Sequence, residues 1–132
     1  MKIVADTNTF LATVLNEPEK SDIIDLTAGH ELIAPPILPF EIGNALSAMV
    51  KKGRLTRKEA LLAFDETEKI PVELRSIDIR KALATAGQHK IYAYDAYFLE
   101  CARATHSPLL TLDAALNKIA AKLGIKLLEV EP

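Results

Sequence analysis

The sequence predicts an α/β fold with a parallel central sheet. Short apolar runs rich in Ile, Leu and Val occur at about residues 2–6, 31–34, 109–112 and 126–130, mostly without polar interruption. Such runs are typical of parallel strands covered on both faces. Stretches with helical periodicity separate them, and this alternation is typical of α/β proteins. We therefore expect an α/β fold with four to five parallel strands.

Seven helices are predicted between and after these strands, at about residues 8–16, 20–28, 37–52, 57–69, 78–88, 94–105 and 114–123. Three prolines at positions 35, 36 and 39 precede or open the third helix, where the first helical N–H groups have no partner in any case. The segment Val72–Leu74 predicts a short fifth strand.

The third and fourth helices are expected to form a hairpin. Gly53 ends the first of them, and Thr56 begins the second with Glu59 three residues later, which is the pattern of a capping box. Residues 51–58 are therefore the predicted tip of the hairpin.

Length and composition predict one domain, residues 1–132, with a single core, because 49% of the 132 residues are hydrophobic. No apolar run approaches the roughly 18 to 20 residues of a membrane span, and no export signal opens the chain. Cys101 is the only cysteine, which excludes an internal disulfide. We expect a soluble, cytoplasmic protein. Its net charge of −2 argues against nucleic-acid binding by bulk electrostatics, but metal ions in an acidic cleft reverse the local field.

Four acidic residues occupy positions that folding alone explains poorly. Asp6 and Asp113 follow apolar strands, and the carboxyl ends of strands are where open α/β sheets bind ligands. Glu41 and Asp95 lie early in helices that can bring them to the same edge. Taken singly, Asp6 and Asp95 are equally well explained as helix caps, and Glu41 as a solvated side chain. Together, crowded carboxylates that stay ionised indicate a divalent-metal site.

The segments around these acids resemble the successive motifs of the PIN domain family. They read Val-Ala-Asp-Thr-Asn, Phe-Glu-Ile-Gly-Asn-Ala-Leu, Tyr-Asp-Ala-Tyr-Phe-Leu-Glu-Cys-Ala and Leu-Leu-Thr-Leu-Asp-Ala-Ala-Leu, in this order along the chain. The resemblance runs from residue 2 to about residue 130. The small single-domain form is most similar to the VapC toxins of toxin–antitoxin pairs.

This resemblance implies a three-layer α/β/α sandwich and a Mg²⁺- or Mn²⁺-dependent ribonuclease. It also implies a cognate antitoxin protein, an RNA substrate and a homodimer. The catalytic acids correspond to Asp6, Glu41, Asp95 and Asp113. Mg²⁺ prefers oxygen ligands, and we expect direct ligation by Asp6 and Asp95, a second or shared ion at Asp113, and orientation of water or metal by Glu41. The residues leave open which carboxylate acts as the base.

Further residues are expected to support the acids. Thr7 or Asn8 and Thr111 match positions where the family often has a small polar residue. The basic hairpin tip is either a solvated surface or a phosphate-contacting patch, and we expect substrate contacts from Lys51, Lys52 and Arg54. Tyr92, Tyr94 and Tyr97 either stack on a base or pack in the core or a dimer.

Other chemistries have little support in the sequence. The glycines form no phosphate loop, and His30, His89 and His106 lack the spacing of a zinc site. Cys101 lies among apolar residues and is expected to pack in the core. Two alternatives to a toxin ribonuclease remain: a nuclease of the same fold in RNA processing, and a non-catalytic module whose acidic cleft binds a protein.

Overall fold

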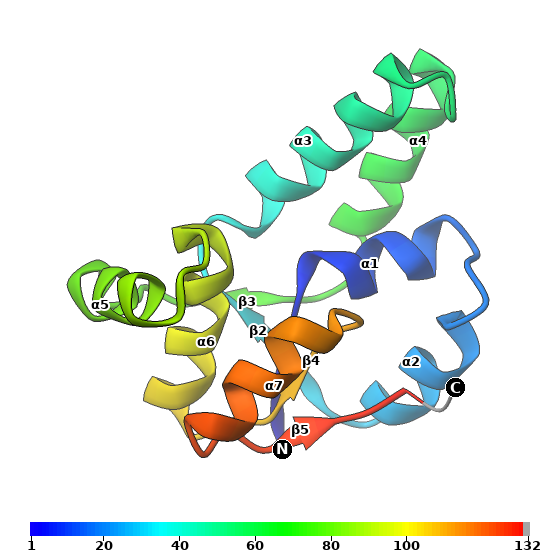
Figure 1. Ribbon diagram of the computed structural model, residues 1–132. Coiled ribbons are helices and arrows are strands. Elements are labelled where there is room, and N and C mark those ends of the chain that lie inside the picture. The colour runs from blue at the N-terminus through cyan, green and yellow to red at the C-terminus, as the bar shows by residue number, and fades with distance from the viewer. Residues whose placement is uncertain (131–132) are drawn as a thin grey trace.

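Five parallel strands form the central sheet of the computed structural model, which describes residues 1–130 (Figure 1). They lie in the order β3-β2-β1-β4-β5, and each neighbouring pair is parallel. The parallel sheet and the short fifth strand are as predicted. The last two strands are shorter than predicted, because only two residue pairs join β4 to β5. The bounds are β1 (Lys2–Ala5), β2 (Glu31–Ala34), β3 (Glu73–Leu74), β4 (Leu109–Leu110) and β5 (Leu127–Leu128).

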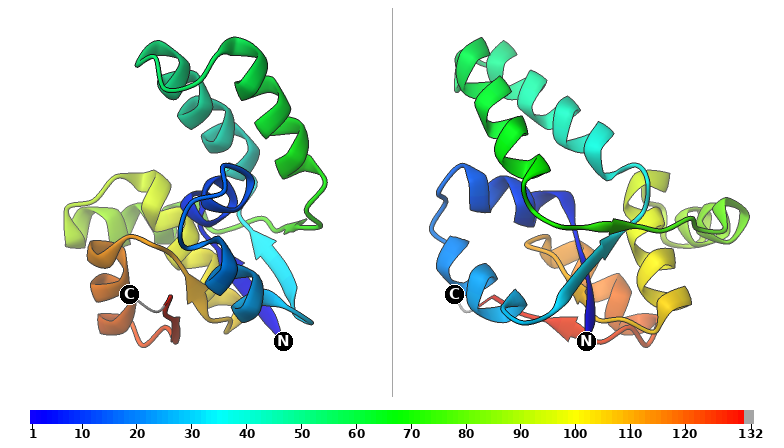
Figure 2. Two further views of the ribbon diagram at one scale, coloured as in Figure 1. Left: turned by 90° about the vertical axis from the view of Figure 1, so that its right-hand side faces the viewer. Right: turned by 180° about the vertical axis from the view of Figure 1, so that it is seen from behind.

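Helices cover both faces of the sheet, which gives the expected three layers. Helices α1 and α2 lie on one side, whereas α6 and α7 lie on the other, with α5 packed against α6 (Figures 1 and 2). All seven predicted helices are present, and their ends agree within two residues. The bounds are α1 (Thr7–Val14), α2 (Lys20–Thr27), α3 (Leu38–Lys51), α4 (Arg57–Glu68), α5 (Ile79–His89), α6 (Ala93–Thr105) and α7 (Ala114–Lys122).

The strands are apolar throughout because both of their faces are buried. Successive strand residues point to opposite faces. Ile3 and Val4 are both 0% exposed: Ile3 packs in a cluster with Ile23 of α2, whereas Val4 belongs to a cluster that includes Phe98 and Leu99 of α6. This double burial accounts for the uninterrupted apolar runs in the sequence.

Helices α3 and α4 form a hairpin that projects beyond the edge of the sheet where the strands end (Figures 1 and 2). Its turn has the predicted features. Gly53 has a φ of +75°, and Thr56 and Glu59 form a capping box in which each side chain accepts from the other residue's backbone N–H. Leu55 packs against the main core from within the turn, so the hairpin tip is held to the helices that support it.

Small side chains allow α5 to approach α6 closely. Ala82 and Ala86 of α5 and Ala96 of α6 form their own buried cluster, and Ala82 and Ala96 are 0% exposed. This contact supports the first turn of α6. Of the helices within residues 1–130, none is both long enough and apolar enough to span a membrane.

Candidate functional site

Asp6 is both a helix cap and a buried acid at the carboxyl end of β1. It is the N-cap of α1, and its Oδ1 atom accepts a hydrogen bond of 2.7 Å from the backbone N–H of Thr7. Its Oδ2 atom accepts a hydrogen bond of 2.8 Å from the Thr111 hydroxyl. Only 6% of Asp6 is exposed. The two explanations offered by the sequence, a cap and a site residue, are therefore compatible.

The Thr111 hydroxyl joins the ends of two neighbouring strands. Besides donating to Asp6, it accepts a hydrogen bond of 3.1 Å from the backbone N–H of Asp113. Asp113 in turn caps α7, because its Oδ1 atom accepts from the backbone N–H groups of Ala115 and Leu116. Thr111 thus fixes Asp6 relative to the start of α7.

Asn117 is a supporting residue that the sequence reasoning missed. Its side-chain amide donates a hydrogen bond of 3.3 Å to the carbonyl oxygen of Thr111. It follows Asp113 by four residues, which places both on one face of α7. This four-residue spacing in the sequence could have identified Asn117 as a supporting residue.

The other two acids come from the first turns of two helices. Glu41 lies in the first turn of α3 and accepts a hydrogen bond of 3.3 Å from the Thr7 hydroxyl. Asp95 is the third residue of α6, whose N-cap is Tyr92. Within residues 1–130, α6 has no side-chain cap, so Asp95 does not cap the helix that carries it.

The charges of the four acids influence one another's pKa values. Burial, followed by the charges of Asp95 and Asp113, raises the pKa of Asp6, although hydrogen bonds from Thr111 and Thr7 oppose this. Burial and the charges of Asp6 and Asp95 raise the pKa of Glu41 to about 7. Burial and the charge of Asp113 raise the pKa of Asp95. Segments separated by more than 100 residues therefore meet at one edge.

The chemistry of this edge fits a divalent cation. Its donors are carboxylate and hydroxyl oxygens, which are the ligands that Mg²⁺ and Mn²⁺ accept. Over residues 1–130, no lysine or arginine contributes to the raised pKa values of Asp6, Glu41 and Asp95. A cation would relieve this uncompensated repulsion. Within residues 1–130, no group of three or more His, Cys, Asp or Glu side chains is already arranged around one ion position.

Some residues singled out in the sequence lie apart from the acids. Asn8 is exposed, and within the described part of the chain its side chain has no hydrogen bond to the acids, whereas Thr7 and Thr111 contact them directly. The sequence left Thr7 and Asn8 as alternatives, and of the two it is Thr7 that contacts an acid. Cys101 is 1% exposed, and burial raises the pKa of its thiol to about 11, as suits a packing residue.

The cations at the hairpin tip lie far from the acids along α3, whereas the exposed tyrosines are close to Asp95 in the sequence. Lys51, Lys52 and Arg54 are exposed at the far end of the hairpin from Glu41. Tyr92 and Tyr94, close to Asp95 in the sequence, are 82% and 55% exposed. The rings of Tyr94 and Tyr97 pack edge to face, with their centroids 6.1 Å apart.

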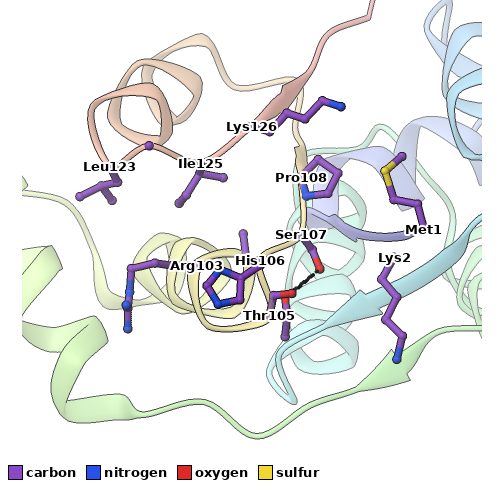
Figure 3. Close-up of a pocket in the computed structure, with 12 residues that line it drawn as sticks. Met1, Lys2, Arg103, Thr105, His106, Ser107, Pro108, Leu123, Ile125 and Lys126 are labelled. Atoms are coloured by element: carbon purple, nitrogen blue, oxygen red, sulfur yellow. Dashed lines mark hydrogen bonds between the residues drawn. The ribbon is translucent and has the colours of Figure 1, made fainter.

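A pocket of about 600 Å³ lies at the opposite edge of the sheet (Figure 3). Its lining includes Lys2 at the start of β1, His106 and Ser107 in the turn before β4, and Lys126 before β5. All of these precede or begin strands, whereas the four acids follow strands or lie early in helices at the other edge. The pocket is therefore separate from the acidic site.

The fold is therefore that of an α/β protein with a parallel sheet. At the carboxyl edge of this sheet, acids from four segments form a site suited to a cation. The chain belongs to the PIN domain family, because the family model for the PIN domain matches residues 3–122. No curated protein matches the sequence.

Solved structures support the same fold. The chain is similar to VapBC2 from Rickettsia felis, described as bound to a DNA fragment from their promoter. That match has 15% identity and a TM-score of 0.68, and it covers 99% of this chain and 100% of that one. PAE2754 from Pyrobaculum aerophilum matches with 18% identity, a TM-score of 0.69 and coverage of 94% and 96%. VapBC-1 from nontypeable Haemophilus influenzae matches with 17% identity, a TM-score of 0.67 and coverage of 98% of both chains.

Proposed function

We propose that this PIN domain is a Mg²⁺- or Mn²⁺-dependent endoribonuclease and the toxin of a toxin–antitoxin pair. PIN domains are generally nucleases that use divalent metals. The observation that carries the proposal is the gathering of acids from four segments at one edge of the sheet. Thr7 hydrogen-bonds to Asp6 and Glu41, Thr111 hydrogen-bonds to Asp6 and Asp113, and the charge of Asp95 acts on Asp6 and Glu41. Repulsion between carboxylates destabilises the folded protein, and a bound cation, which their oxygen donors suit, would remove that cost.

Each acid has a role that follows from its surroundings. Asp6 is held by two hydrogen bonds, so it is suited to fix the position of an ion, which Asp95 and Asp113 would also hold. A divalent cation held there supplies positive charge that polarises the phosphodiester and makes water a better nucleophile. Glu41, whose pKa is about 7 in the metal-free protein, would ionise more fully beside a bound cation and is then suited to orient water or the ion. Thr7 orients the Glu41 carboxylate.

The proposed partner is a cognate antitoxin protein. The chain has the fold of the VapBC proteins described above, and a further similar structure is that of FitAcB from Neisseria gonorrhoeae, with a TM-score of 0.59 and 16% identity. By this likeness, an antitoxin would cover the acidic edge and keep RNA from it, in the cytoplasm.

We also propose that the protein forms a homodimer. Several large apolar side chains are exposed on α5 and at the starts of α3 and α6, elements that lie close together in Figures 1 and 2. Exposed apolar groups gathered in this way are typical of protein interfaces. They are Phe40, Ile79, Leu83, Tyr92 and Tyr94.

Single-turnover cleavage of defined RNAs in Mn²⁺ tests the enzymatic part of the proposal. We expect Asp95→Asn to cleave at least about 100-fold more slowly than the natural protein, the magnitude typical of losing a group that stabilises charge in the transition state. The free Mn²⁺ signal in electron paramagnetic resonance should show weaker metal binding by both Asp6→Asn and Asp95→Asn.

Asp65→Asn is the matched control, because Asp65 is exposed on α4 and the substitution makes the same chemical change. It should cleave RNA and bind Mn²⁺ like the natural protein. Equal cleavage by the Asp95→Asn variant would point to a contaminating nuclease and contradict the proposal.

A further inference from the structure

The turn of the α3–α4 hairpin concentrates positive charge in a protein whose net charge is −2. Five of the 16 lysines and arginines lie within residues 51–58, and all five are exposed. In the part of the chain that the structure describes, none of the five forms an ion pair. Glu59 is the acid nearest in sequence, and its carboxylate accepts the hydrogen bond of the capping box from the backbone N–H of Thr56. We call these residues the basic tip: Lys51, Lys52, Arg54, Arg57 and Lys58.

Folding does not account for the whole basic tip. Lys51 lies in the last turn of α3, where the helix dipole favours a cation. Arg57 and Lys58 are the first two residues of α4, where the same dipole disfavours cations. Five like charges within eight residues also repel one another. An anionic ligand is what would remove both costs.

The hairpin connects the basic tip to the acidic site. Glu41 lies in the first turn of α3, and Lys51 ends the same helix. Ten residues at 1.5 Å each separate them by about 15 Å along the helix axis. At about 3.4 Å per stacked nucleotide, this distance corresponds to roughly four to five nucleotides. The buried side chains of Leu46 on α3 and Ala63 on α4 hold the two helices to the core.

We propose that the basic tip binds the phosphate backbone of the RNA substrate several nucleotides away from the bond that is cleaved. This inference rests on the proposed ribonuclease activity and extends it to substrate length. Lysine and arginine contacts to phosphates carry little sequence information, so the basic tip adds affinity and a salt dependence rather than base preference. An RNA shorter than the span from Glu41 to Lys51 cannot occupy both sites.

Fluorescence anisotropy with fluorescein-labelled single-stranded RNAs of 4 and 20 nucleotides and mixed sequence tests the inference. EDTA in the buffer prevents cleavage, so binding is measured whether or not the protein is a nuclease. The tip variant carries K52Q, R54Q, R57Q and K58Q, and keeps Lys51. The control variant carries K81Q, K118Q, K122Q and K126Q, which remove the same charge from exposed positions elsewhere. Circular dichroism melts establish that both variants fold.

We expect the tip variant to bind the 20-nucleotide RNA at least about tenfold more weakly than the natural protein at 50 mM NaCl. The slope of log affinity against log salt should fall by about 0.7 for each phosphate that the variant no longer neutralises, or about 3 in total. The tetranucleotide offers the basic tip fewer phosphates, so it should bind the natural protein more weakly than the longer RNA does and lose less affinity in the tip variant. The control variant should retain most of its affinity for the longer RNA.

Equal losses in the tip and control variants would mean that only net charge matters, and would overturn the inference. So would unchanged RNA binding by the tip variant. If labelled poly-glutamate alone required the basic tip, the ligand would be an acidic protein instead. A natural protein that binds long RNA through the basic tip but fails to cleave RNA in Mn²⁺ would refute the proposed function, and only RNA binding at the basic tip would then stand.

Discussion

At the scale of single residues, Glu41 couples folding to pH. Its pKa is raised from 4.5 to about 7, so between these values the folded protein holds a proton that the unfolded chain has released. Metal-free protein should therefore lose stability as the pH rises from 4.5 to 7. Allowing for solvent screening of this partly exposed side chain, we expect a loss of about 1 to 2 kcal/mol.

Urea unfolding in EDTA at pH 4.5 and 7.5 measures this effect. The Glu41→Gln variant should lose less stability between the two pH values than the natural protein does. Glu68→Gln on the exposed surface of α4 is the control and should behave like the natural protein. The same pH dependence in Glu41→Gln and in the natural protein would show that Glu41 ionises in the folded state without a penalty.

Thr111 offers a second test at this scale. Thr111→Val keeps the shape of the side chain but removes the hydroxyl that donates to Asp6 and accepts from the N–H of Asp113. Leaving these buried groups unpaired should cost about 1 to 3 kcal/mol of unfolding free energy. It should also weaken Mn²⁺ binding about tenfold, the effect usual for a residue that orients a ligand.

Denaturant unfolding and Mn²⁺ titration check this prediction, with Thr111→Ser expected to restore both properties. Thr27→Val is the control, because the Thr27 hydroxyl bonds only to backbone carbonyls of its own helix. Normal Mn²⁺ affinity in Thr111→Val would mean that the position of Asp6 does not depend on this hydroxyl.

At the scale of elements, the packing of α5 against α6 controls the position of Asp95. Ala82 is fully buried at this contact, so Ala82→Leu should force the helices apart and cost about 1 to 3 kcal/mol. Because Asp95 lies in the first turn of α6, RNA cleavage should fall as well. Ala84→Leu adds the same side chain at an exposed position of α5 and should change neither property. Thermal melts and single-turnover cleavage distinguish the two variants, and equal stability would contradict the close packing.

The helices and strands were largely predictable because their signals are local. Double burial makes the strands apolar at every position, and the Thr56–Glu59 capping box marks the start of α4 directly. The ends of β4 and β5 were less predictable because strand length depends on pairing with a neighbour, and only two residue pairs form there.

The candidate site was predictable in its acids but not in its connections. Strand ends and helix starts identified Asp6 and Asp113 as residues of one edge. Their link through the Thr111 hydroxyl depends on a contact between residues 105 positions apart, which no local pattern contains. The same limitation hid the contact from Asn117 to the Thr111 carbonyl, although its helical spacing from Asp113 was visible.

At the scale of the whole molecule, we can make a prediction about assembly from the exposed apolar side chains of α5. If a homodimer forms there, Leu83→Asp should shift the protein towards the monomer, because a carboxylate would be buried without a partner. Leu61→Asp is the matched control, since Leu61 is similarly exposed on α4. Sedimentation velocity over a range of concentrations measures the mass. A dimer that persists in Leu83→Asp and dissociates in Leu61→Asp would place the interface on α4.

The strand order has a consequence for when the acidic edge forms during synthesis. Because β1 lies between β2 and β4, Asp6 leaves the ribosome before Thr111 and meets it only after the 105 residues that separate them have been added. A nascent chain that ends near residue 105 lacks β4 and the acid at position 113. Synthesis of the chain at least to residue 113 therefore precedes assembly of the acidic edge, and shorter nascent chains should lack the proposed metal site.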